Sequence, residues 1–228
     1  MNRNFLRLVI LISVLCAVHG TAYALPITIT NYSFENPDPG DPGSWTQGIP
    51  IPGWSSTDDN MTGVINAGPT SGFGNTASVG ENAAWVQGVN SIWQILTAPL
   101  LANHEYTLSV DVGNRSGSFW TLNPIIELRS NQTVLKSQGI SVLPDDGTFG
   151  TINLVYQSGN FVPLGEFLGI ALLNTGDFWT QSHFDNVRLD ATALGSPTAA
   201  TPEPGTMMLM GIGVAVAAFM RRRKMKDA

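Results

Sequence analysis

Charged side chains and cysteine are both scarce in this sequence, and each scarcity excludes classes of protein. Only 12% of the 228 residues are Asp, Glu, Lys or Arg, against about 25% in an average domain. The deficit excludes a coiled coil, a highly charged disordered chain and a basic nucleic-acid binder. The single cysteine, Cys16, excludes a disulfide framework and a cysteine-based zinc site.

The charges that are present are segregated along the chain. Basic residues gather at the two ends, whereas residues 26–200 hold 4 basic and 15 acidic side chains, a net charge of −11. Phosphate backbones and anionic membrane surfaces repel a body this acidic. We therefore expect no nucleic-acid partner, and we expect cations or neutral partners such as sugars.

The N-terminus has the pattern of a secretory signal peptide, residues 1–24. Two arginines precede an apolar run over residues 8–18, which is too short to span a bilayer comfortably. Ala22 and Ala24 then match the small-x-small rule for cleavage by signal peptidase. Cleavage there makes Leu25 the first mature residue. The only cysteine lies within the signal, so the mature chain contains none.

The C-terminus has three consecutive parts, which follow a flexible linker predicted over residues 192–200. Pro202-Glu203-Pro204 is rigid and non-helical. Residues 206–220 are uncharged and mostly apolar, and Arg221-Arg222-Arg223 opens a basic cluster. We expect the apolar part to form a short hydrophobic helix, about 22 Å long against about 30 Å of hydrocarbon, that lodges in a membrane transiently. The basic cluster keeps its end on the cytoplasmic side.

This order of parts, over residues 201–228, resembles the PEP-CTERM sorting signal of Gram-negative bacteria. The resemblance implies export, cleavage near the Pro-Glu-Pro by the membrane enzyme exosortase, and a final place at the cell surface or in the extracellular matrix. It also implies a producer that makes extracellular polysaccharide. Thr201 stands where valine is commonest, which is a mild departure. A simple C-terminal anchor is the alternative interpretation.

Residues 25–191 are expected to form one all-β domain. Short runs rich in β-branched and aromatic residues are separated by turns rich in Gly, Pro and Asp, with no sustained helical period. Eight or more such runs indicate a two-sheet antiparallel sandwich of the jelly-roll kind. The predicted strands cover residues 27–31, 83–87, 92–96, 105–112, 125–129, 151–156, 167–173 and 183–189.

Two motifs near the ends of this body carry a second resemblance. Asn31-Tyr32-Ser33-Phe34-Glu35 opens it and Phe184-Asp185-Asn186-Val187-Arg188-Leu189 closes it. The pair resembles the opening and closing motifs of galactose-binding-like jelly rolls and related carbohydrate-binding modules. The resemblance implies a structural calcium ion held by Glu35 and Asp185, with backbone carbonyls completing its six to eight oxygens. Alternatively, the two acids are strand-end residues that bond backbone N–H groups.

The body contains all six tryptophans, and aromatic faces beside polar groups are typical of sugar sites. Trp120 and Trp179 stand in stretches with loop composition, close in sequence to Arg115, Asn174 and Asp177. We expect these five residues to bind sugar. Covering the edge of the core is the alternative role for both tryptophans.

The other tryptophans favour structural roles. Trp85 and Trp93 sit inside strand patterns and are expected in the core. Trp54 follows Pro52-Gly53 and is expected to seal one end of the sandwich.

Signatures of catalysis are weak, and no catalytic residue is predicted. Only His104 and His183 remain in the mature chain, and neither the nucleophile-elbow motif nor the zinc-binding His-Glu-x-x-His motif occurs. The prediction is a non-catalytic, exported protein that binds extracellular polysaccharide. One alternative is a structural or adhesive matrix protein without a sugar site. Another is a glycan-active hydrolase, because glycosidase carboxylate pairs need no local signature.

Overall fold

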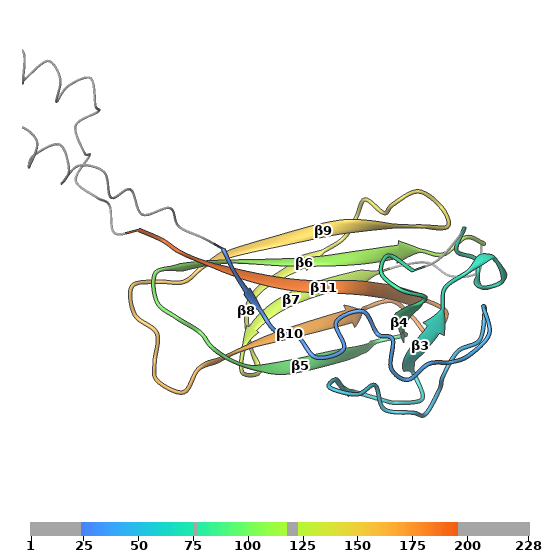
Figure 1. The fold of residues 1–228 in the computed structure, drawn as a ribbon, viewed down its shortest axis with the longest axis horizontal. Helices are drawn as coiled ribbons and strands as arrows, with labels where there is room; N and C mark the ends of the chain where they lie inside the picture. The colour runs from blue at the N-terminus through green and yellow to red at the C-terminus, as the bar shows by residue number, and fades with distance from the viewer. Residues whose placement is uncertain (1–23, 75–76, 118–122, 196–228) are drawn as a thin grey trace, which may run out of the picture. The chain divides into compact units, whose positions relative to one another are not determined.

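The computed structural model describes residues 24–74, 77–117 and 123–195 (Figure 1). These residues form two antiparallel sheets and one short 3-10 helix, η1 (Pro69–Ser71). The all-β sandwich predicted from the sequence is confirmed. Within the described ranges, no helix is long and apolar enough to cross a membrane.

The larger sheet has six strands in the order β3-β4-β11-β6-β9, and β1 also pairs with β11. β11 is central because it pairs with β6 along one edge and with β4 and then β1 along the other. The strand bounds are β1 Leu25–Ile27, β3 Thr62–Asn66, β4 Asn82–Gln87, β6 His104–Asn114, β9 Thr148–Gln157 and β11 Gln181–Ala193.

The smaller sheet has five strands in the order β2-β5-β10-β7-β8. It packs against the larger sheet, and the two inner faces share one hydrophobic cluster. The strand bounds are β2 Ser55–Ser56, β5 Asn90–Pro99, β7 Pro124–Ser130, β8 Thr133–Gly139 and β10 Phe167–Asn174.

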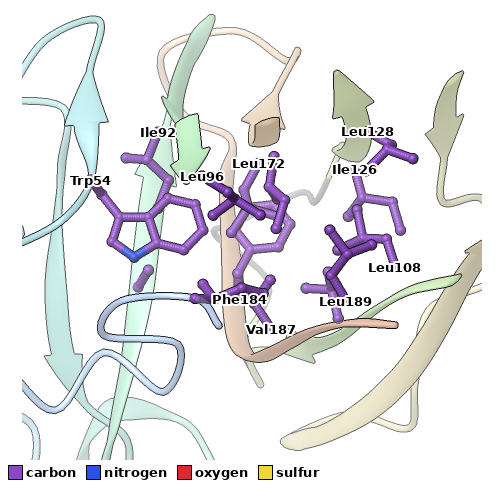
Figure 2. Close-up of a cluster of buried hydrophobic side chains, with 14 of the residues drawn as sticks. Trp54, Ile92, Leu96, Leu108, Ile126, Leu128, Leu172, Phe184, Val187 and Leu189 are labelled. Atoms are coloured by element: carbon purple, nitrogen blue, oxygen red, sulfur yellow. The ribbon is translucent and has the colours of Figure 1, made fainter. Parts of the chain in front are cut away.

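Alternation along the strands builds the core. On β6, every second side chain from Tyr106 to Val112 has no exposed surface. These side chains share one cluster with apolar residues of the smaller sheet, and Figure 2 shows part of it. Burial of each Leu or Ile side chain stabilises the fold by about 1.5–3 kcal/mol. Because the two-residue period places these side chains on one face of each sheet, the two sheets pack face to face. The facing residues include Ile126, Leu128, Leu168, Ile170 and Leu172.

Seven of the eight predicted strands correspond to β4, β5, β6, β7, β9, β10 and β11. The predicted first strand, residues 27–31, is wrong because β1 ends at Ile27. Asn31 has a φ of 51° and its carbonyl accepts from Phe34 N at 3.2 Å, so the chain turns there. β3 and β8 were not predicted, because neither strand alternates between buried and exposed residues. β3 is buried along its whole length, and β8 is mostly exposed.

The tryptophans do not all lie where their strand patterns suggested. Trp54 lies in the core against Phe34, with ring centroids 5.2 Å apart. Trp93 is only half-buried, because its neighbour Ile92 points inward and puts it on the outer face of the smaller sheet. Trp85 is buried, but in a separate small cluster outside the sandwich. The expectation that both strand tryptophans belong to the core is corrected accordingly.

A β-bulge in β11 sets which residues face outward. The register against β6 shifts just after Asp185, where Asn186 has a φ of 48°. Phe184 and Val187 both enter the core (Figure 2). His183 and Asp185 alternate with them and lie on the outer face of the larger sheet.

Candidate functional site

The described residues between β3 and β4, 67–74 and 77–81, cover part of the outer face of the larger sheet. We call them the cover segment. Phe73 packs edge-on against His183, with ring centroids 5.1 Å apart. Val79 N donates to a carboxylate oxygen of Asp185 at 2.7 Å. These contacts bury two titratable side chains that would otherwise face solvent.

A pocket of about 240 Å³ opens on the same outer face. We call it the aromatic pocket. Its walls come from β3, β4, the start of β11, the loop after β6 and the segment between β1 and β2. The residues that line it are Trp45, Gln47, Ile65, Trp85, Gln87, Arg115 and Gln181.

Two tryptophans form the apolar walls of this pocket. Trp85 is almost fully buried and its Nε1 donates to Thr46 O at 3.2 Å, whereas Trp45 is 64% exposed. Gly63 pairs with Trp85 across β3 and β4, and a Cβ at Gly63 would lie 2.8 Å from Trp85 Nε1 and 2.1 Å from Thr46 O. The buried indole therefore needs glycine at position 63.

Amides and a guanidinium supply the polar rim. Arg115 Nη1 donates to Gln181 Oε1 at 3.3 Å, and Gln87 Nε2 donates to Phe178 O at 2.8 Å. None of the described residues lining the pocket is an acid, a histidine or a cysteine. Indole faces with neutral amides suit a ligand that has apolar C–H faces and hydroxyl edges.

His183 lies on the next outward position of β11 after Gln181 and has no exposed surface. Neither ring nitrogen has a hydrogen-bond partner among the described residues. Burial lowers the pKa of His183 to about 3, and the charge of Arg115 contributes to the shift. The imidazole is therefore neutral at physiological pH.

Three carboxylates, Glu35, Asp111 and Asp185, lie on the outer face beneath and beside the cover segment. We call them the acid cluster. Glu35 accepts from the backbone N of Glu81 at 3.2 Å and of Asn82 at 3.1 Å. Asp185 accepts from the backbone of Val79 and of Asn186. Both acids accept from backbone N–H groups, as in the alternative expectation, but neither is a strand-end residue: Glu35 lies between β1 and β2, and Asp185 lies inside β11.

The environments of the two buried acids shift their pKa values in opposite directions. Burial raises the pKa of Asp185 to about 7, and the charges of Asp111 and Glu35 add to the shift. Burial also opposes ionisation of Asp111, but hydrogen bonds from Ser78, Thr151 and Asn186 and the nearby Arg188 outweigh it and lower its pKa. Arg188 lies 3.4 Å from an Asp111 oxygen.

The acid cluster meets part of what a calcium ion requires. Asn82 Nδ2 donates to Glu35 at 3.2 Å, while its buried Oδ1 has no partner among the described residues. That oxygen, Glu35 and Asp185 are the kinds of donor Ca²⁺ prefers. Over the same described ranges, no three His, Cys, Asp or Glu side chains converge on one point. Backbone carbonyls and water must therefore supply most of the six to eight ligands.

The five residues predicted to bind sugar do not all meet at one place. Arg115 lines the aromatic pocket. Trp179 is 66% exposed and stands edge-on to Phe178 at 5.2 Å, and the Phe178 carbonyl accepts from the pocket residue Gln87. Trp120 lies outside the described residues.

Asn174 and Asp177 hold the loop between β10 and β11. Asn174 is buried, its Nδ2 donates to Gly88 O at 2.8 Å and to Thr180 Oγ1 at 2.7 Å, and its Oδ1 accepts from Ser182. Asp177 Oδ1 accepts from Trp179 N at 3.0 Å. Both side chains are engaged within the protein.

Of the residues that line the pocket, only Arg115 was predicted from the sequence to bind a ligand. Trp85-x-Gln87 and Gln181-x-His183 alternate on paired strands, so each pair faces the same side of one sheet. That two-residue period was the available signal. It could not say that the outer face, rather than the core, receives Trp85, nor that Trp45 lies opposite.

The fold and the pocket define a class: a single antiparallel β-sandwich with an aromatic-walled pocket on the outer face of one sheet. The chain belongs to the HpiC1-like family, because the family model described as HpiC1 cyclase matches residues 25–190. A second model, the PEP-CTERM protein-sorting motif, matches residues 200–224. A search among curated proteins finds no match.

Solved structures from Fischerella sp. TAU are similar over the whole body. The Stig cyclase Fisc in complex with (3Z)-3-(1-methyl-2-pyrrolidinylidene)-3H-indole has 30% identity and a TM-score of 0.67, covering 75% of this chain and 100% of that one. A cyclase in complex with 4-(1H-indol-3-yl)butan-2-one has 30% identity and a TM-score of 0.66, covering 76% and 100%. TmCBM61 in complex with beta-1,4-galactotriose has 16% identity and a TM-score of 0.45, covering 70% and 94%.

The sorting motif predicted from the sequence is confirmed. It marks the chain as exported, with a C-terminal signal that anchors it to the membrane before exosortase processes it. The signal peptide and the Gram-negative host stay predictions; Ala24, the last residue of that peptide, is exposed immediately before β1. The predicted sorting residues fall inside the matched range but outside the described residues: Pro202, Glu203, Pro204, Arg221, Arg222 and Arg223.

Proposed function

We propose that this protein is an exported, non-catalytic member of the HpiC1-like family that binds extracellular polysaccharide in the aromatic pocket. The observation that carries the proposal is the chemistry of the lining. Indole walls and a rim of amides and one guanidinium match the apolar faces and hydroxyl edges of a sugar. Without a carboxylate or imidazole in the described lining, such a pocket binds rather than turns over its ligand.

Affinity electrophoresis on gels containing the producer's exopolysaccharide tests this proposal. We expect the wild-type protein to be retarded and Trp45→Ala to migrate freely, since Trp45 is the exposed wall and its removal scarcely touches the core. Phe161→Ala is the matched control, because Phe161 is 78% exposed and stands in the loop between β9 and β10, far from the pocket strands. Unchanged migration of the wild type on every glycan would contradict the proposal.

Catalysis on an indole compound is the second candidate, and the family match favours it. Relatives 30% identical to this chain are cyclases solved with indole ligands, and two tryptophan walls can also stack on an indole. Such a reaction needs a proton donor. The acid whose pKa is raised to about 7, Asp185, is fully buried and does not line the pocket.

Calorimetric titration with 4-(1H-indol-3-yl)butan-2-one separates the two candidates. If the pocket binds only sugar, titrating the wild-type protein with this indole compound should release no more heat than titrating Trp45→Ala. Binding that Trp45→Ala abolishes, together with no retention on any glycan, would favour the cyclase alternative.

We also propose that a calcium ion binds at Glu35 and Asp185, with Asn82 Oδ1 as a third side-chain donor. The unpartnered buried amide oxygen and the buried, partly protonated acid support this assignment. A bound cation would offset the repulsion among the carboxylates. Its role would be structural, because these residues join the opening loop, the cover segment and β11.

A further inference from the structure

Both ends of the described body lie at one end of the sandwich. β1 begins at Leu25, which pairs with Ala191, and β11 ends at Ala193 (Figure 1). The aromatic pocket lies at the opposite end, because Gln181 at the start of β11 and Gln87 at the end of β4 line it. The exported chain therefore leaves the body at the end farthest from its pocket.

Hydrogen bonds fix two loops beside the point where the chain leaves. Leu194 N donates to Asn103 O at 2.7 Å, and Asn103 N donates to Gly159 O at 2.9 Å. Leu100 N donates to Glu166 O, also at 2.9 Å. The loop between β9 and β10 is thus tied at both of its ends to the turn that holds Leu194.

These two loops present an uncharged apolar tip to solvent. Phe161 is 78% exposed, Leu164 is fully exposed and Leu101 is 44% exposed. We call these three residues the apolar tip. No charged residue occurs between Gly159 and Gly165. Single exposed apolar residues are ordinary, but an aromatic and two leucines on two loops that are hydrogen-bonded to each other offer apolar area for an interaction.

The number of residues between Leu194 and the membrane anchor indicates that the membrane is the partner of this surface. The apolar run of the sorting signal begins at residue 206, and the twelve residues from Leu194 to this run reach at most about 43 Å when fully extended. The 13 residues of β11 alone span about 44 Å, so the opposite end of the sandwich lies about one further tether length from the point where the chain leaves the body. The apolar tip is therefore on the end of the body at which the anchored signal is attached.

We propose that the apolar tip inserts into the membrane interface while the C-terminal signal anchors the chain. Phenylalanine and leucine at the edge of a bilayer lose apolar contact with water, as on the apolar face of an interfacial helix. The acidic body excludes an electrostatic attraction to anionic headgroups, so the contact rests on apolar insertion. Insertion of the tip would direct the aromatic pocket, at the opposite end of the sandwich, away from the membrane.

A single fluorescent label on the anchored protein tests this orientation. The chain that begins at Leu25 contains no cysteine, so Leu164→Cys gives a unique site for an environment-sensitive dye. Val142→Cys is the matched control, because Val142 is 81% exposed in the loop between β8 and β9, at the pocket end. Each labelled chain, with its C-terminal signal, is reconstituted in phosphatidylcholine vesicles after circular dichroism has confirmed its fold.

We expect the emission at position 164 to shift to shorter wavelength on vesicles and to be quenched by nitroxide-labelled lipid, with neither effect at position 142. Equal shifts at both positions, or no shift at position 164, would overturn the proposal. The readout does not depend on sugar binding. Its failure is therefore distinguishable from a failure of the proposed function.

Discussion

At the scale of the residue, the aromatic pocket depends on the absence of a Cβ atom at Gly63. Trp85 occupies its wall only because Gly63 has no side chain. Gly63→Ala would displace the indole and break its bond to Thr46 O, and we expect a loss of about 1–3 kcal/mol of unfolding free energy together with weaker retention on glycan gels. Urea denaturation and affinity electrophoresis measure the two effects.

Gly139→Ala controls for this substitution within a strand. A Cβ at Gly139 meets no atom within 4 Å and the backbone needs no positive φ, so stability should change by less than about 0.5 kcal/mol. If the two alanine variants behave alike, the close contact at Gly63 is not what positions Trp85.

Asn174 and Asp177 distinguish support of a loop from contact with a ligand. Asn174→Ala leaves several buried partners without a hydrogen bond, and we expect unfolding to become easier by about 2–4 kcal/mol. Asp177→Ala removes one exposed cap of a turn and should cost about 1 kcal/mol or less. Chemical denaturation ranks the two variants. A small loss for Asn174→Ala with abolished glycan retention would instead make it a ligand residue.

At the scale of the element, the acid cluster joins the cover segment to β11. If a calcium ion binds there, its removal by a chelator should lower Tm and speed amide exchange at Val79 and Glu81. Differential scanning fluorimetry and hydrogen exchange, with and without Ca²⁺, measure these changes.

Asp185→Asn decides between a metal ligand and a purely structural acid. With calcium as the partner, this variant should lose the calcium-dependent rise in Tm. Asp190→Asn, on the same face of β11, should keep that rise and serves as the control. If Asp185→Asn is as stable as the wild type and neither protein responds to calcium, the site holds no metal. That result would mean that the neutral amide avoids the cost of burying the Asp185 carboxylate, whose pKa burial raises to about 7.

At the scale of the whole molecule, the charge of the body restricts its glycans. With 4 basic and 15 acidic residues between positions 26 and 200, it repels acidic polymers at long range. We expect stronger retention on a neutral galactan than on alginate at low salt, and a smaller difference as salt screens the repulsion. A preference for alginate at low salt would contradict this view.

Much of the fold could be predicted because local patterns determine it. Alternation along Glu105 to Val112 predicted β6, and the motif around Asp185 predicted the closing strand β11. The residues between Ile27 and Asn31 also alternate, yet the chain turns there, because the backbone at Asn31 adopts a positive φ. Hydrophobic pattern alone does not encode that choice.

The candidate site was only partly predictable. Arg115 was identified from its polar, loop-like surroundings, and Glu35 and Asp185 from their motifs. Trp45 and Trp85 are 40 residues apart in the sequence and line one pocket only because Trp45 pairs with β3 and β3 pairs with β4. A two-residue period says which side chains share a face, but not whether that face points into the sandwich or out of it.

By itself, the sequence determined that this protein is exported and that its body is an all-β sandwich. The sorting motif lies in consecutive residues, and strand alternation is a local property of the chain. Only the tertiary structure decided where the pocket, the acid cluster and the apolar tip lie. Each of these brings together residues from separate strands or loops, and sheet pairing sets those distances rather than the spacing along the chain.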